Sequence, residues 1–291
     1  MNLKFNYAIV SILLTIDERK MTMNKEDHQF FKQNGYLPLG NILTQAELAY
    51  FTQAFDRDHT QFADHWHRVG HHQTVNGDVL VTSPDFDQVI RHPKVMAPLQ
   101  NLMSGPICFS EISLRHMSAY DGELHRSWHR DRRHWLSHPL RTDYLQLMVY
   151  LTDVDETTHC FSISPESAAE EILDRGNQLQ RGGMVDLYGS AGTCVLFNVA
   201  VLHTATTRPT TAARKSIQVY YGHTNRPHLS EITYIPYAFW RDHVEPEARD
   251  FYSVFNRKTE IYWQEAEDRP ELPLNQELEL LRHINRQIRG E

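Results

Sequence analysis

The sequence predicts a mainly β domain braced by flanking helices, an antiparallel sandwich or jelly roll, and three observations support this fold class. Helix signals gather in the first hundred residues and in the C-terminal tail, whereas short strand patterns dominate the middle of the chain. No internal repeat or linker rich in proline, glycine and serine divides the 291 residues. Helices first, then many strands, then a closing helix are typical of one such domain.

The helical elements follow from caps and apolar spacing. A first helix is expected over residues 25–33, ending near Gly35, with GYLPLG as a short extended piece after it. Thr44 can cap a second helix, and Glu47 completes its capping box. A third helix is expected over residues 85–103. The tail ELELLRHINRQI has the spacing of an amphipathic helix.

The clearest strand pattern covers residues 144–151. Leucine and valine alternate there with Tyr144, Gln146, Met148 and Tyr150, so the two sets occupy opposite faces. We take the face with tyrosine and glutamine as the barrel interior. Residues 195–199 and 216–221 also have strand patterns.

Composition limits the function classes. The chain is 41% hydrophobic and 23% charged, and its net charge of −8 argues against a general nucleic-acid binder. Its cysteines, Cys108, Cys160 and Cys194, are far apart and form no CxxC motif, which indicates neither a zinc ribbon nor a disulfide framework. We therefore expect a reducing, cytoplasmic location.

The N-terminal apolar run YAIVSILLTI is too short to span a bilayer, and charged DERKM follows it instead of a small-residue cleavage site. A signal peptide is the less favoured alternative. We expect residues 1–23 to be a dispensable leader, disordered or read from an upstream start codon, and residues 24–291 to form a single domain. No membrane association is expected.

The stretch SWHRDRRHW contains the first candidate ligands. Residues two apart in an extended segment point to the same side, so His129 and Asp131 present an imidazole and a carboxylate together. A metal site with two histidines and one carboxylate needs that pair and a distant histidine. In a chain with 18 histidines an HxD alone is weak evidence.

His203 is the candidate third ligand, because it follows an apolar strand expected to end near Leu202. His159 and His223 are the alternatives. Eleven residues later, Arg214 shares one face of the next strand with Ser216. An arginine that points into the barrel is costly to bury unless it pairs with an anion. Its planar guanidinium can bind a carboxylate through two parallel hydrogen bonds. A surface arginine ahead of an edge strand is the alternative.

Together these residues resemble the iron(II)/2-oxoglutarate oxygenases, in the order HxD, a second histidine and an arginine. Within that superfamily, FFKQNGYLPLGNILTQAELAYF, WHRD and FSISPES resemble segments of the phytanoyl-CoA dioxygenase family, over about residues 25–225. The chain departs from the family in Arg130 between the first two ligands, and in PESA where a PGSH turn is usual.

The resemblance implies a cupin-like double-stranded β-helix that uses Fe(II), 2-oxoglutarate and O2. It implies that His129, Asp131 and His203 bind the metal, and that Arg214 with Ser216 binds the far carboxylate of 2-oxoglutarate. Gln146 is a candidate for the near carboxylate, with a glutamine satisfied by its sheet neighbours as the alternative. Related halogenases lack the carboxylate ligand, so Asp131 favours hydroxylation, or demethylation through a hydroxylated carbon.

The arginines around the ligands suggest an anionic small-molecule substrate. Arg126 and Arg130 are the candidate anion-binding residues, with Trp128 and Met117 as candidate lining residues; a solvated strand edge is the alternative. An amino-acid derivative fits, such as a mycosporine-like amino acid.

Two other function classes remain open. One is a non-catalytic cupin-like metal-binding protein. The other is a zinc-dependent hydrolase that uses the same three ligands, but a hydrolase gives no reason for an inward Arg214 and Ser216. Succinate formation that requires Fe(II), 2-oxoglutarate and O2 discriminates among the three.

Overall fold

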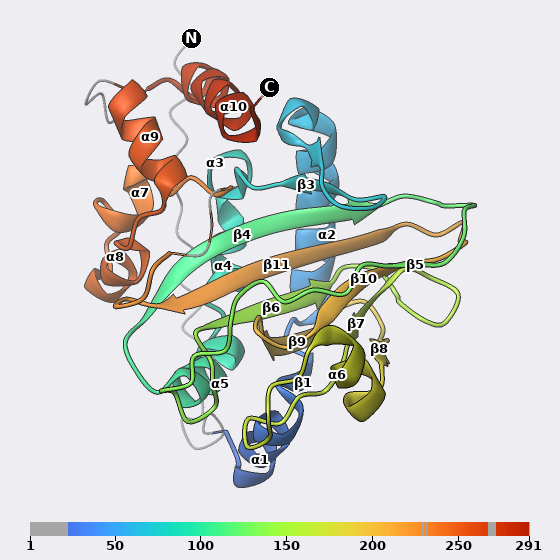
Figure 1. Ribbon diagram of the computed structural model, residues 1–291. Helices are drawn as coiled ribbons and strands as arrows, with labels where there is room; N and C mark the ends of the chain where they lie inside the picture. Colours follow the sequence, from blue (N-terminus) through green and yellow to red (C-terminus); the bar gives the residue numbers. More distant parts are fainter. Residues whose placement is uncertain (1–22, 229, 231, 267–271, 291) are drawn as a thin grey trace.

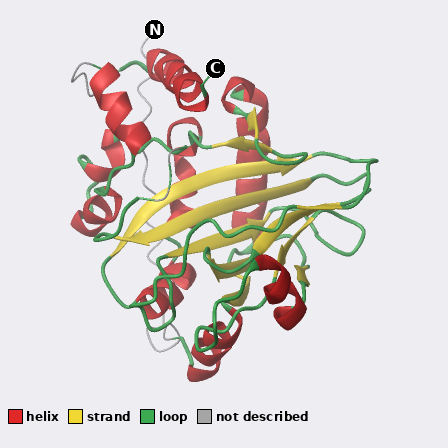
Figure 2. Cartoon of the chain, in the orientation of Figure 1, coloured by secondary structure: helices red, strands yellow, loops and turns green. Residues whose placement is uncertain are grey.

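The computed structural model describes residues 23–228, 230, 232–266 and 272–290. Two antiparallel sheets face each other, and helices surround them (Figures 1 and 2). The large sheet has the strand order β1-β9-β6-β11-β4-β3-β2, and the small sheet has the order β5-β10-β7-β8. The mainly β fold with flanking helices, a double-stranded β-helix or jelly roll, is therefore confirmed.

The elements have the following bounds. The strands are β1 (Tyr36–Asn41), β2 (His67–Arg68), β3 (Thr74–Asn76), β4 (Ile107–Met117), β5 (His125–Arg126), β6 (Tyr144–Tyr150), β7 (Cys160–Ile163), β8 (Val185–Leu187), β9 (Thr193–Asn198), β10 (His203–Thr207) and β11 (Arg214–His223). The α-helices are α1 (Lys25–Asn34), α2 (Gln45–Gln61), α3 (Val79–Thr82), α4 (Asp87–Ile90), α5 (Pro93–Met103), α6 (Arg175–Gly182), α7 (Tyr237–Trp240), α8 (Pro246–Tyr252), α9 (Arg257–Glu265) and α10 (Leu274–Arg289); Ala63–His65 and Pro84–Phe86 form 3-10 turns.

The N-terminal helices form where the caps predict them. α1 ends at Gly35, whose φ is +73°, and a Cβ there would lie 2.4 Å from Cγ2 of Val201, so only glycine fits. The capping box of α2 is complete: the Glu47 amide donates to the Thr44 hydroxyl, and the Thr44 amide donates to the Glu47 carboxylate. The predicted leader, residues 1–23, lies outside the described residues apart from Met23.

Two element predictions are wrong. Residues 85–103 form a 3-10 turn, α4 and α5 instead of one helix, because Pro93 disfavours helical backbone at His92, which instead caps α5. The apolar strand before His203 ends at Asn198, so His203 begins the following strand, β10, after a turn. Asn198 stabilises that turn by accepting a hydrogen bond from the Ala200 amide.

Alternate side chains of β6 pack into two different hydrophobic cores. Leu145, Leu147 and Val149 pack with the helices on the outer face of the large sheet, where α2 lies in Figure 1. Met148 and Tyr150 pack between the two sheets. The face with tyrosine and glutamine is therefore the barrel interior, as the sequence predicts, and it positions the site.

A buried charge cluster fastens the C-terminal helices to the barrel. Asp78 contacts the Lys258 ammonium of α9, accepts a hydrogen bond from Asn285 of α10 at 2.8 Å, and pairs with the His65 ring at 2.8 Å. Burial alone would raise the pKa of Asp78, but Lys258 and His65 hold it well below its usual range. Asp78 is therefore a carboxylate in the folded protein.

Lys258→Met is expected to lower the free energy of unfolding by about 3 kcal/mol, because it leaves a buried carboxylate without its cation. Urea denaturation measures this loss. Lys215→Met is the matched control: the pair that Lys215 forms with Asp56 is partly exposed and contributes at most about 1 kcal/mol. Equal losses in the two variants would contradict a special role for the buried pair.

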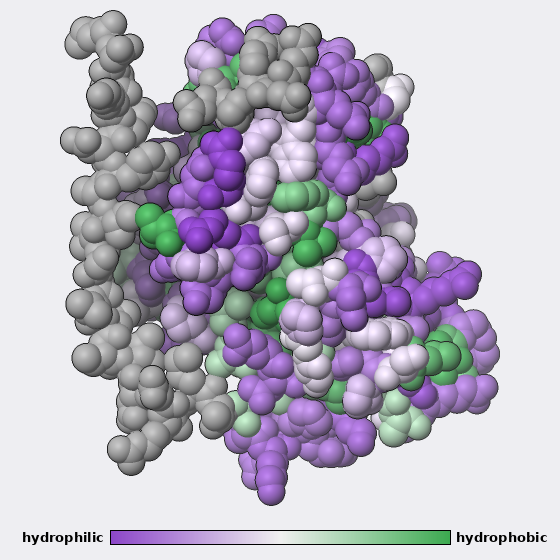
Figure 3. Space-filling view, turned by 90° about the vertical axis from the view of Figure 1, so that its left-hand side faces the viewer, coloured by the Kyte–Doolittle hydropathy of each residue, from purple (hydrophilic) through white to green (hydrophobic). Residues whose placement is uncertain are grey.

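Polar side chains predominate on the end of the molecule that carries α7 to α9, and apolar side chains lie there in small separate areas (Figure 3). Within the described residues, no helix combines the length and the apolar character that a bilayer-crossing segment needs.

Candidate metal centre and active site

His129, Asp131 and His203 meet where β10 begins. The backbones of His129 and His203 exchange two hydrogen bonds, with N···O distances of 3.0 and 2.9 Å. The Asp131 amide donates to the Val199 carbonyl at 3.0 Å, which fixes the extended segment after the bridge. One ligand atom from each of the three side chains lies within 4.8 Å of the others, so the group could hold one metal ion.

Backbone carbonyls orient both imidazoles. Nδ1 of His129 lies 2.7 Å from the Ser127 carbonyl, and Nδ1 of His203 lies 2.8 Å from the Val201 carbonyl. A carbonyl can only accept, so Nδ1 is the protonated nitrogen and Nε2 keeps its lone pair. The two Nε2 atoms face Oδ1 of Asp131 at 3.4 and 3.6 Å. The tautomers and ring orientations suit a divalent metal.

The electrostatics of the ligands are those of a cation site. Burial alone would raise the pKa of Asp131, but the two imidazoles lower it well below its usual value. The hydrogen bond with Asp131 raises the pKa of His129. The Tyr220 hydroxyl donates to the other carboxylate oxygen of Asp131 at 2.9 Å. Asp131 therefore keeps a negative charge and a fixed orientation.

Arg214 lies on the interior face of β11 with little to bind. It is buried, and within the described residues its guanidinium forms one hydrogen bond, a long one of 3.4 Å from Nη2 to the Gln73 amide oxygen. Nε and Nη1 of Arg214 and the Ser216 hydroxyl are buried without a partner. Burial lowers the pKa of Arg214. An unsatisfied buried guanidinium costs free energy, and the far carboxylate of 2-oxoglutarate would supply the missing acceptor.

The exposed fractions of the interior residues of β11 show which end of the barrel is open to solvent. Tyr220, beside the three candidate ligands, is 7% exposed, Gln218 is 3% exposed, and Ser216 and Arg214 are 0% and 1% exposed. The metal end is therefore the end that solvent reaches, and the Arg214 end is deep. A dicarboxylate held at both ends would lie along this strand, with its far carboxylate inside.

Two other predicted residues occupy the interior. Gln146 lies opposite Tyr220 in the sheet and donates from Nε2 to Oε1 of Gln218 at 2.6 Å. It is thus near the metal end, and its amide already has one sheet partner. Met117 lies opposite Arg214 and is fully buried, so it borders the deep end instead of the mouth.

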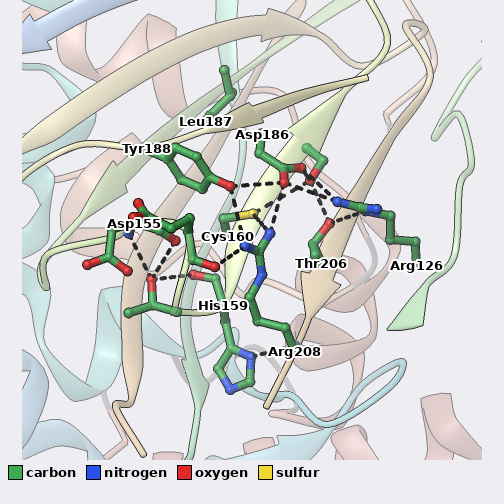
Figure 4. Close-up of polar contacts among 12 residues, drawn as sticks. Arg126, Asp155, His159, Cys160, Asp186, Leu187, Tyr188, Thr206 and Arg208 are labelled. Atoms are coloured by element: carbon green, nitrogen blue, oxygen red, sulfur yellow. Dashed lines mark hydrogen bonds and ion pairs between the residues drawn. The ribbon is translucent and has the colours of Figure 1, made fainter. Parts of the chain in front are cut away.

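Arg126 is held in an ion pair of its own. Figure 4 shows Arg126 and Arg208 reaching toward Asp186 from two sides. The Nη2–Oδ2 distances are 3.0 Å for Arg126 and 2.8 Å for Arg208. Nε of Arg126 also donates to the Thr206 hydroxyl at 3.1 Å. The predicted role of Arg126 in binding a substrate anion therefore has no geometric support.

Arg130 and Trp128 lie on the side of the segment opposite to the ligands, because His129 and Asp131 share the other side. Arg130 is paired with Glu166 at 2.7 Å, and that carboxylate also accepts the Leu202 amide. Trp128 is half-buried. The role of Arg130 in binding substrate stays a prediction, as does that of Arg126, because each charge is already paired with an acid of the chain.

A surface hollow of about 480 Å³ adjoins Asp131, and three arginine side chains line it. Arg132 and Arg226 both pair with Asp143, at 3.1 and 2.8 Å. Arg133 is exposed, and no ion pair or hydrogen bond of its guanidinium occurs within the described part of the chain. We call Arg132, Arg133 and Arg226 the arginine groove.

Sequence reasoning missed Arg226 of this groove and two interior charges on β4, Glu111 and Arg115. Arg226 follows β11 in a stretch without any motif. Glu111 and Arg115 share the interior face of β4 with Ser113, and the alternation of polar residues in SEISLRHM is the signal that could have found them.

The alternative third ligands lie elsewhere. Nε2 of His159 lies 2.8 Å from the Ser118 carbonyl, and its Nδ1 accepts the Arg208 amide at 3.3 Å, so both nitrogens are engaged. The His223 ring, at the last residue of β11, packs against Trp135 and His138 and not against Asp131. Neither residue belongs to the group around Asp131.

A two-sheet barrel with two histidines and a carboxylate at one end, and an unsatisfied arginine inside, defines the class of Fe(II)- and 2-oxoglutarate-dependent oxygenases. The family described as phytanoyl-CoA dioxygenase (PhyH) matches residues 31–216. The chain belongs to the phytanoyl-CoA dioxygenase family, and its cofactors are Fe(II), 2-oxoglutarate and O2. No curated protein sequence matches the chain.

Solved structures share the fold at low identity. HygX from Streptomyces hygroscopicus, with nickel and 2-oxoglutarate bound, has a TM-score of 0.57 and 17% identity over 74% of this chain and 96% of its own. EctD from S. alaskensis with bound Fe has a TM-score of 0.59 and 16% identity over 74% and 82%. The 2-oxoglutarate-dependent epimerase SnoN from nogalamycin biosynthesis has a TM-score of 0.60 and 16% identity over 80% and 95%.

Proposed function

We propose that His129, Asp131 and His203 bind one Fe(II), and that Arg214, assisted by Ser216, binds the far carboxylate of 2-oxoglutarate. Gln146 is the candidate partner of its near carboxylate. The observation that carries this proposal is the buried guanidinium of Arg214, whose Nε and Nη1 have no partner, inside the same barrel as the three candidate ligands. No neighbouring acid in the described residues neutralises it.

With O2 and 2-oxoglutarate, bound Fe(II) supplies the oxidant that removes hydrogen from a substrate C–H. The chain's own residues orient the reactants. The Ser127 and Val201 carbonyls hold the imidazoles, and Tyr220 holds Asp131. The deep, closed position of Arg214 keeps water from its pairing with the cosubstrate, which strengthens that pairing.

We propose hydroxylation, or oxidative demethylation, of a small anionic metabolite such as an amino-acid-derived natural product; a mycosporine-like amino acid is one example. The arginine groove supports an anion, because Arg132, Arg133 and Arg226 share the hollow with Asp143 and the metal ligand Asp131 as its acids. Arg133 carries the unpaired charge of this groove, whereas Arg132 and Arg226, like Arg126 and Arg130, already form ion pairs. We also propose a cytoplasmic enzyme, since its three cysteines are free thiols.

The test is succinate formation by the purified protein. We expect succinate only when Fe(II), 2-oxoglutarate and O2 are all present, and faster formation in the presence of an anionic substrate. Zinc-dependent ester or amide hydrolysis without O2 would instead identify a hydrolase. Iron binding with no succinate under any condition would identify a non-catalytic metal-binding protein.

Arg133→Gln is expected to raise KM for an anionic substrate about two- to fivefold, the range for an exposed charge pair, and the effect should shrink at high salt. Initial rates at several salt concentrations measure it. Arg57→Gln, an exposed arginine on α2, is the matched control. If both variants keep the wild-type KM at low salt, the arginine groove does not bind the substrate.

A further inference from the structure

Glu111 is the buried carboxyl group with the fewest partners in the described structure. Asp78 contacts Lys258, Asp143 pairs with two arginines, and Glu166 pairs with Arg130. The remaining buried acid, Asp58, accepts hydrogen bonds from Trp66, Asn76, Thr82 and Ser83. The neighbouring Ser230 hydroxyl favours the charged form of Glu111, and no cation lies within ion-pair distance of its carboxylate among the described residues.

Glu111 faces the metal end of the barrel interior. It lies directly opposite Tyr220 in the pairing of β4 with β11, so the two side chains share the interior face. Tyr220 donates to the ligand Asp131. Glu111 and Tyr220 are each 7% exposed, whereas Ser113 and Gln218, one step deeper on the same two strands, are 0% and 3% exposed. Glu111 therefore lies toward the less buried end of these two strands, on the side of the candidate metal ligands.

The surroundings of Glu111 favour a positively charged partner. Burial raises the pKa of Glu111, which means that its negative charge is poorly solvated; the charge of Arg115 only partly offsets this. Nε of Arg115 donates to the Ser113 hydroxyl at 3.1 Å, so its guanidinium is held one step deeper along β4. A neutral donor would only replace a hydrogen bond that water could give to the Glu111 carboxylate. A cationic donor would also balance the negative charge of that carboxylate.

We propose that Glu111 binds a cationic amino group of the substrate. This rests on the proposed function, in which the arginine groove binds the substrate's carboxylate. The substrate class is then a zwitterion, an amine-bearing carboxylic acid. Asp131 borders the groove and is linked through Tyr220 to the strand position opposite Glu111, so a substrate held at both ends presents its intervening C–H beside the metal ligands.

The experiment uses matched sets of probes: protein amino acids, their N-acetyl derivatives and the corresponding 2-hydroxy acids. Succinate formation by the iron- and 2-oxoglutarate-loaded enzyme is measured with each probe, together with the shift of the anaerobic iron-to-2-oxoglutarate absorbance band, which reports binding without turnover. We expect stimulation and band shifts from amine-bearing acids, with kcat/KM at least about 10-fold above that of the matched N-acetyl and hydroxy acids. Equal responses within a set, or no response to any amine-bearing acid, would overturn the proposal.

The second arm asks whether Glu111 causes the selectivity. Glu111→Gln keeps the size and removes the charge, so the preference for the amine-bearing acid over its hydroxy counterpart should fall by at least about 10-fold. Glu123→Gln, an exposed carboxylate, should keep the wild-type preference. A purely structural role would lower kcat/KM for both probes equally, and that result would reject the proposal.

Arginine variants separate this proposal from the proposed function. If Arg133→Gln leaves KM unchanged while Glu111→Gln abolishes the preference for amines, the anion-binding groove fails and the amine site stands. The reverse pattern rejects the amine site alone. If Glu111→Gln does not fold, the selectivity of the wild-type enzyme among the matched probes still decides the outcome.

Discussion

His203→Ala is expected to abolish iron retention after anaerobic reconstitution. His203 is one of the two proposed nitrogen ligands, and the Val201 carbonyl orients its ring. Within the described residues, no other histidine belongs to the group that could replace it. Each ligand lost from a site with only three protein ligands removes a large share of the binding free energy. Iron content measured after desalting, together with the metal-to-ligand absorbance band, gives the result.

His159→Ala is the matched control for this variant. His159 is also a buried histidine, but both of its ring nitrogens contact the backbone, at Ser118 and Arg208. It should therefore retain iron. Full iron occupancy in His203→Ala would rule out His203 as the third ligand, and loss of iron in both variants would indicate a general loss of structure.

The ligand group was accessible from the sequence because local rules determine most of it. The parity of an extended segment places His129 and Asp131 on one side, and apolar patterning marks the strands that lead toward His203. The predicted end of the strand before His203 was wrong, because the strand ends at Asn198 and a turn separates it from His203. The Asn198 side chain stabilises that turn, and a pattern of apolar residues carries no signal for such a hydrogen bond. The ligands still meet because the backbones of His129 and His203 pair directly.

The proposed substrate-binding residues could not be predicted from the sequence in the same way. Arg126 and Arg130 are close to the ligands in sequence, but their charges are neutralised by Asp186 and Glu166, which are 60 and 36 positions away. Charge density along the chain cannot distinguish a paired arginine from one that faces a cavity. Arg226 reaches the same hollow as Arg132 through the return of the chain after β11, which is a tertiary contact.

Arg214→Ala is expected to weaken 2-oxoglutarate binding by roughly 30- to several-thousand-fold while iron binding survives. Truncating one partner of a desolvated, charge-assisted pair costs about 2–5 kcal/mol, and each 1.4 kcal/mol corresponds to a factor of about ten. The burial of Arg214 and the lack of partners at Nε and Nη1 are the conditions under which this range applies. Anaerobic titration of the metal-to-ligand absorbance band measures the affinity.

Arg214→Lys keeps the charge but loses the planar fork, so its affinity should fall between those of the wild type and Arg214→Ala. Lys215 cannot substitute, because it lies on the opposite face of β11 and pairs with Asp56. Arg126→Ala removes an arginine that is paired with Asp186, and it should keep the wild-type affinity for 2-oxoglutarate. If Arg214→Ala binds 2-oxoglutarate as tightly as the wild type, the far carboxylate is held by another residue, and the interior cation to test next is Arg115, which lies opposite Ser216 on β4.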